Sequence, residues 1–159
     1  MTKIFRVLPY ILLTLNLLFI FGNSVLDGPS SRVISTKAEE AIEQVVGKDI
    51  ENDPYEVAMY GRTFNAFLRK CAHAAEFFSL AVLSYICAAP LKGAVRPLSL
   101  ILMGIGVPLL DETLQLFHAR SGLISDMWID ITGYAAGAVL MLVIEIIYNL
   151  VRKKRQENE

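Results

Sequence analysis

The sequence predicts an all-α protein, a bundle of four transmembrane helices with an extracytoplasmic amphipathic segment between the first and second helices. Of the 159 residues, 54% are hydrophobic and only 19% are charged, whereas a soluble domain carries about 25% charged residues. The apolar residues gather in four runs, each near the length of about 20 residues that a spanning helix needs. Because no repeat or low-complexity linker divides the chain, we expect a single membrane domain over residues 1–159.

The first two predicted spans differ in their polar content. The first covers residues 7–23, an apolar run preceded by Lys3 and Arg6. A secretory signal peptide has a similar pattern, but the length of this run and the spans after it favour a retained helix. The second span covers residues 67–90 and has several ionisable residues in its first turns.

The third and fourth predicted spans complete the bundle. The third covers residues 95–117, and Pro108 interrupts it about one turn before Asp111. A proline inside a helix removes a backbone hydrogen bond and commonly kinks the helix. The fourth span covers residues 125–151.

Basic residues near the span ends predict the orientation of the bundle. Lysine and arginine are enriched in the cytoplasmic segments next to membrane spans. An even number of spans places the two tails and the loop between the second and third spans on one side. We therefore expect a multi-pass protein of the cell membrane with both termini in the cytoplasm and the lipid bilayer as its partner. The basic residues are Lys3, Arg6, Lys92, Arg96, Arg152, Lys153, Lys154 and Arg155.

The predicted outer loop, residues 24–66, is acidic, with eight acidic and four basic residues. Thr36 and Glu39 have the spacing of a capping box, which marks the start of a helix. Small and apolar residues then recur at helical spacing up to Gly47. The pattern predicts a short amphipathic helix on the outer membrane surface, and an acidic loop without a helix is the alternative.

Charged and polar residues gather at one depth of the bundle, and we call these ten residues the polar cluster. Such residues are costly inside a membrane, so they usually face the bundle interior or a wet cavity. With the orientation above, the polar cluster lies in the outer half of the bilayer or at its rim. We expect the second, third and fourth spans to bring these side chains into one site. The ten residues are Arg69, Lys70, His73, Glu76, Asp111, Glu112, Gln115, Arg120, Asp126 and Asp130.

A glycine pair on the fourth span predicts close helix packing. Gly133 and Gly137 have the Gly-x-x-x-Gly spacing that lets neighbouring helices approach each other. Asp126 and Asp130 lie on the same stripe, since all four positions fall within about 60° at 100° per residue. We therefore expect both aspartates to face a neighbouring helix and not lipid.

The polar cluster carries a formal charge of −2 when His73 is neutral, with three basic and five acidic side chains. Such a surplus predicts that one or two acids are protonated, or that the site takes up a cationic group or a divalent cation. The alternative is an ionic network that fixes helix register and binds no ligand.

Residue chemistry suggests two sets of roles within the polar cluster. Imidazole and carboxylate groups transfer protons or hold metals, whereas arginine and lysine bind phosphate or carboxylate groups. The pattern does not identify metal ligands. The candidate catalytic residues are His73, Glu76, Asp111 and Glu112, and the candidate substrate-binding residues are Arg69, Lys70, Gln115, Arg120, Asp126 and Asp130.

The runs LRKCAHAAEF and DETLQLFHARSGLISDMWIDITGYAAG resemble the VanZ-like membrane proteins over about residues 5–150. The shared pattern is an Arg-Lys pair with a histidine, then Asp-Glu-x-x-Gln, an arginine, and an aspartate before a Gly-x-x-x-Gly helix. Asp130 and Phe77 depart from it, because the family often has asparagine and tyrosine at these positions. The family's namesake is associated with low-level resistance to teicoplanin, so the resemblance implies a role in the bacterial envelope.

These observations favour a protein that binds or modifies a cell-envelope molecule, such as a lipid-linked precursor, from the outer side. A non-catalytic partner of envelope proteins and a small ion or solute transporter remain as alternatives. The sequence lacks a P-loop, a Gly-x-Ser-x-Gly motif, a His-Glu-x-x-His motif and any nucleic-acid-binding pattern. It decides neither the reaction nor whether the protein is an enzyme.

Overall fold

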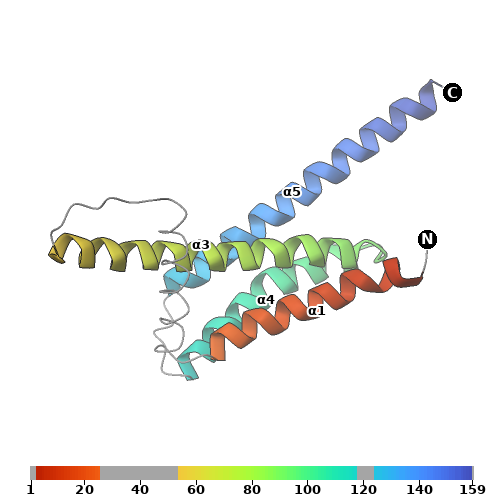
Figure 1. Ribbon diagram of the computed structural model, residues 1–159. Helices are drawn as coiled ribbons and strands as arrows, with labels where there is room; N and C mark the ends of the chain where they lie inside the picture. The colour runs from red at the N-terminus through yellow and green to blue at the C-terminus, as the bar shows by residue number, and fades with distance from the viewer. Residues whose placement is uncertain (1–2, 26–53, 118–123, 159) are drawn as a thin grey trace.

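The computed structural model describes residues 3–25, 54–117 and 124–158, which form four helices and no strand (Figure 1). The helices pack so that α3 contacts each of the other three, and α4 also contacts α1 and α5. The start of α1 and the end of α5 lie at the same end of the bundle (Figure 1), as an even number of spans requires. The helices are α1 (Lys3–Val25), α3 (Pro54–Ala88), α4 (Val95–Phe117) and α5 (Ile124–Glu157).

Each helix contains a segment that is long and apolar enough to cross a membrane, which confirms the predicted fold class. Large aliphatic side chains cover the outer surfaces, and Leu18, Leu98 and Leu150 are each more than 60% exposed. Such surfaces suit lipid, because a bilayer has no water to oppose apolar exposure. The candidate spans are Val7–Val25, Lys70–Ala88, Val95–Phe117 and Asp126–Glu157.

Three helices extend beyond the predicted spans, α1 by a few residues at each end and α3 and α5 by more. The helix α3 begins at Pro54, so residues 54–66, predicted as part of the outer loop, are helical. Proline is well suited to the first turn of a helix, where its missing N–H is not needed. The helix α5 continues to Glu157, whose carboxylate oxygen Oε1 lies 3.8 Å from Nζ of Lys153, one turn earlier. The expected short helix between Thr36 and Gly47 lies outside the described residues.

The apolar core lies where the four helices meet, and α4 continues through the buried Pro108. Phe77 and Leu80 of α3 are fully buried at its centre. They pack with side chains from each of the other helices. The core cluster consists of Ile20, Phe77, Leu80, Ala81, Val107 and Tyr134.

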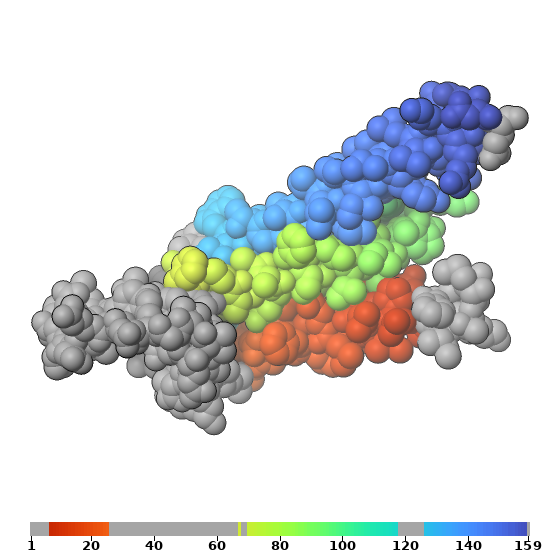
Figure 2. All heavy atoms as spheres, turned by 45° about the horizontal axis from the view of Figure 1, so that its top comes forward, coloured from red at the N-terminus to blue at the C-terminus, as the bar shows by residue number. Residues whose placement is uncertain are grey.

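The glycines of α5 lie directly on the backbone of α3, as the Gly-x-x-x-Gly pattern predicts. A Cβ atom added at Gly133 would collide with the carbonyl oxygen of Ala74, and one added at Gly137 would lie 2.6 Å from the carbonyl oxygen of Phe78. The close approach fixes how α5 is rotated against α3. Beyond this contact, the C-terminal half of α5 extends away from α1 (Figures 1 and 2).

A bidentate ion pair joins α4 to α5 near the end opposite the polar cluster. Two guanidinium nitrogens of Arg96 lie 2.6 and 3.1 Å from the two carboxylate oxygens of Glu145. The hydroxyl of Tyr85 on α3 donates to the same carboxylate, and Arg96 lies 4.8 Å above the Tyr85 ring. Charge-assisted pairs with this fork geometry are the stronger type, so Glu145, to which the sequence assigned no role, links three helices.

Candidate functional site

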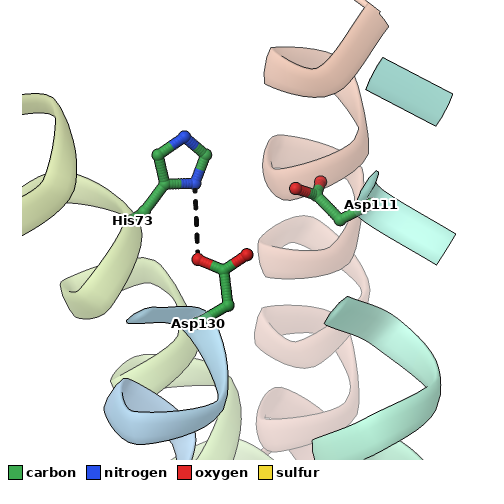
Figure 3. A group of neighbouring side chains, drawn as sticks. All are labelled: His73, Asp111 and Asp130. Atoms are coloured by element: carbon green, nitrogen blue, oxygen red, sulfur yellow. Dashed lines mark ion pairs between the residues drawn. The ribbon is translucent and has the colours of Figure 1, made fainter. Parts of the chain in front are cut away.

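Three members of the polar cluster meet in the bundle interior (Figure 3). His73 comes from α3, Asp111 from α4 and Asp130 from α5, and one ligand atom of each lies within 4.8 Å of the others. His73 Nδ1 lies 3.7 Å from Asp130 Oδ1. The expectation that three spans bring their ionisable residues together is confirmed for this group, which we call the buried centre.

The carboxylate of Asp111 is fully buried and is held from two helices. Gln115, one turn later on α4, donates from Nε2 to Asp111 Oδ2 at 2.7 Å. The hydroxyl of Ser24 on α1 hydrogen-bonds to Asp111 Oδ1. Ser24 and Gln115 are themselves buried, so the orientation of the Asp111 carboxylate is set by groups that cannot easily turn toward solvent.

The carboxylate of Asp130 is equally buried but has different surroundings. Its exposure is 1%, and neither of its oxygens has a hydrogen-bond partner among the described residues. No lysine or arginine among the described residues forms an ion pair with the Asp130 carboxylate. A carboxylate placed in this way is energetically costly unless a proton or cation compensates it. The contact of Gly133 with Ala74, one turn later, holds Asp130 at this position.

Other members of the polar cluster surround the buried centre. The amide of Asn23 on α1 donates from Nδ2 to Glu76 Oε1 on α3 at 3.0 Å. Glu76, Glu112 and Asp126 are half-buried and act electrostatically on Asp130. Their proximity concentrates negative charge around one point of the bundle.

Among the basic members of the cluster, the structure describes the side chain of Lys70. Lys70 is exposed. The side chain of Arg69 and the whole of Arg120 lie outside the described residues. Their assignment to ligand binding therefore stays a prediction, as do the catalytic and binding roles of the acidic members.

The helix α1 supplies two polar contacts that the sequence did not single out. Ser24 and Asn23 follow an otherwise apolar run, at the same end of the bundle as the polar cluster. Their place at the end of that run is the signal that points to them. With these residues, all four helices contribute to a site whose imidazole and carboxylates can exchange protons or coordinate a cation.

A family model described as VanZ/LLP1 matches residues 7–146, which include α3, α4, most of α1 and α5, and the whole polar cluster. Comparisons with curated proteins and with solved structures give no significant match. The resemblance suggested by the two sequence runs is thus confirmed by a match over nearly the whole chain. This membrane protein belongs to the VanZ/LLP1 family.

Proposed function

We propose that this protein binds a polar molecule of the cell envelope through the polar cluster, on the outer side of the membrane, and that it lowers susceptibility to glycopeptides such as teicoplanin. The observation that carries the proposal is the meeting of buried carboxylates and a histidine from three helices in the buried centre. Buried ionisable groups in membrane helices usually mark functional sites. Family membership supports the link to glycopeptides.

The placement of basic residues supports the outer location of the site. The described members of the polar cluster lie in the C-terminal half of α4 and in the N-terminal parts of the spans of α3 and α5, and the C-terminal end of α1 contacts them. The clusters of lysine and arginine next to the spans belong to the opposite ends of the same helices. By the positive-inside tendency, that opposite end faces the cytoplasm. The polar cluster then lies toward the outer side of the membrane, where glycopeptides act on cell-wall precursors.

The residue types also suit an envelope precursor that carries both phosphate and polar groups. Arg69, Lys70 and Arg120 are candidates for contacting phosphate or carboxylate oxygens. His73 and the acidic residues then contact polar groups of the same molecule or move protons within it. With these assignments, the main role of the cluster is to bind the molecule, and any reaction at the site would follow that binding.

Susceptibility to teicoplanin in a Gram-positive host that lacks the protein tests the proposal. Expression of the wild type should raise the inhibitory concentration severalfold, and Asp111→Asn should remove the increase. Thr113→Ala is the matched control on the same helix, because Thr113 is exposed and hydrogen-bonds only to the carbonyl of Leu109 among the described contacts. Membrane levels of all three proteins must be equal.

Mass spectrometry of the purified protein gives a second test. A lipid-linked envelope molecule should copurify with the wild type and Thr113→Ala and should be lost from Asp111→Asn. A wild type that neither changes susceptibility nor retains such a molecule would refute the proposed function. A change in susceptibility without a retained molecule would favour a non-catalytic partner of envelope proteins.

A further inference from the structure

We infer that His73, Asp111 and Asp130 form a binding site for one divalent transition-metal ion, Mn²⁺ or Zn²⁺. The three residues come from three helices and bring one imidazole and two carboxylates to a single point (Figure 3). This inference concerns an ion and stands independently of the envelope ligand proposed above.

The distances between the three ligand atoms are close to those of a metal site. Bonds from zinc to nitrogen and oxygen are about 2.0–2.2 Å long, which places tetrahedral ligands about 3.4 Å apart. His73 Nδ1 and Asp130 Oδ1 lie 3.7 Å apart, and no pair of the chosen atoms exceeds 4.8 Å. Small rotations of the side chains would therefore bring all three atoms onto one ion.

The charge of the buried centre matches that of a divalent ion. A neutral imidazole and two carboxylates sum to −2, and Asp111 and Asp130 are at most 1% exposed. Neither aspartate forms an ion pair with a lysine or arginine among the described side chains. One ion of charge +2 would cancel this charge without any further group.

The oxygens of Asp130 provide independent evidence that this site takes a ligand. They are buried, lack hydrogen-bond partners within the described part of the chain, and point toward His73 and Asp111 (Figure 3). A proton shared with His73 does not satisfy them in this geometry, because 3.7 Å is too long for a hydrogen bond. A metal ion between the two side chains would bond to His73 Nδ1 and to an Asp130 oxygen at the same time.

Residues around the centre hold one ligand in place, as in known metal sites. Gln115 and Ser24 hydrogen-bond to the two oxygens of Asp111 and leave further lone pairs on each oxygen. Such outer contacts orient metal ligands and are often needed for full affinity. Three protein ligands also leave an open coordination position, which is typical of zinc sites that bind water or substrate.

The ligand types select the class of ion. Imidazole suits zinc, iron and nickel, whereas carboxylates suit manganese and the harder ions, and thiolates select softer metals. The set has one nitrogen, two oxygens and no sulfur. Manganese is the better probe, because thiolates such as those of the free Cys71 and Cys87 compete poorly for it.

Metal titration of the full-length protein tests the site. The protein is purified in detergent with a tag that lacks histidine, stripped with chelator and titrated with Mn²⁺ while electron paramagnetic resonance follows the free ion. We expect one bound ion per chain, with a pulsed-resonance coupling to an imidazole nitrogen. An absence of stoichiometric binding, or bound Mn²⁺ without a nitrogen coupling, would overturn the inference.

The chain offers a matched pair of histidine variants, since His118 is its only other histidine. His73→Gln should abolish the nitrogen coupling and lower the affinity at least tenfold, and His118→Gln should change neither. Equal loss in both variants, or none in His73→Gln, would contradict the assignment. Asp130→Asn provides a second ligand variant if His73→Gln does not fold, with Thr132→Ala as its exposed control on the same helix. Because the assay detects the ion alone, its failure leaves the proposed envelope ligand untouched.

Discussion

The packing of α5 on α3 predicts that alanine is harmful at two glycines and harmless at a third. At Gly137, an added Cβ would lie 2.6 Å from the carbonyl oxygen of Phe78, whereas ordinary contacts begin near 3.4 Å. The helices would have to separate by about 0.8 Å, or the backbone would have to bend. Gly133 is still more restricted, because its Cβ would meet the carbonyl oxygen, Cα and carbonyl carbon of Ala74.

The change in the free energy of unfolding caused by each alanine is the sum of two opposing contributions. Alanine stabilises the interior of a helix by about 1 kcal/mol relative to glycine. Overpacking a well-packed contact costs about 1–3 kcal/mol, and here the opposing atoms are backbone that cannot rotate away. Gly106→Ala isolates the first term, since its nearest atom is a Leu102 methyl at 3.8 Å. The difference between Gly133→Ala and Gly106→Ala therefore measures the steric term, which we expect to be about 1–3 kcal/mol.

Thermal unfolding in detergent, followed by the fluorescence of the single tryptophan, Trp128, measures the difference. Gly133→Ala and Gly137→Ala should unfold at lower temperature than Gly106→Ala. Gly133→Ala should also weaken Mn²⁺ binding, because a displaced turn moves Asp130 away from His73. Equal unfolding temperatures for all three alanine variants would refute the close approach of α5 to α3.

Three further predictions concern the ion pair, the topology and the buried charge. Glu145→Gln should lower the unfolding temperature, because it leaves Arg96 unpaired. Adding Arg96→Met to Glu145→Gln should lower the unfolding temperature little further, and a double-mutant cycle measures this coupling. In a cysteine-free background, Glu40→Cys should react with a membrane-impermeant label in intact cells and Ala94→Cys should not; the reverse pattern would invert the topology. Chelator should lower the unfolding temperature of the wild type and not that of Asp130→Asn, and an absence of ion dependence in the wild type would contradict the metal site.

The four spans and the common depth of the charged residues could be predicted from the sequence because both depend on positions along single helices. A run of about 20 apolar residues marks a span regardless of how the helices pack. The helical spacing of Asp130 to Gly133 and Gly137 predicts that the aspartate lies on the packed face, whichever helix is the neighbour. The structure identifies that neighbour as α3, with Ala74 and Phe78 in the contact.

Features that depend on helix ends and on rotation between helices could not be predicted. Hydropathy marks where a helix enters the membrane and not where it begins, so the start of α3 at Pro54 was missed. Arg96 and Glu145 lie 49 residues apart in the chain, and their pairing depends on how α4 and α5 are rotated. Ser24 has no periodic pattern, and its role appears only when α1 lies against α4.

Two polar groups of the described helices differ in how completely their carboxylates are paired. Near one end, the carboxylate of Glu145 is matched by a guanidinium and a hydroxyl, so this group needs nothing further to be stable in the membrane. Near the other, the carboxylate of Asp130 is buried beside Asp111 with no hydrogen bond among the described residues. Packing alone favours the first arrangement and opposes the second, because an uncompensated buried charge is costly. We therefore propose that a ligand completes the second arrangement and that the buried centre carries the function of this protein.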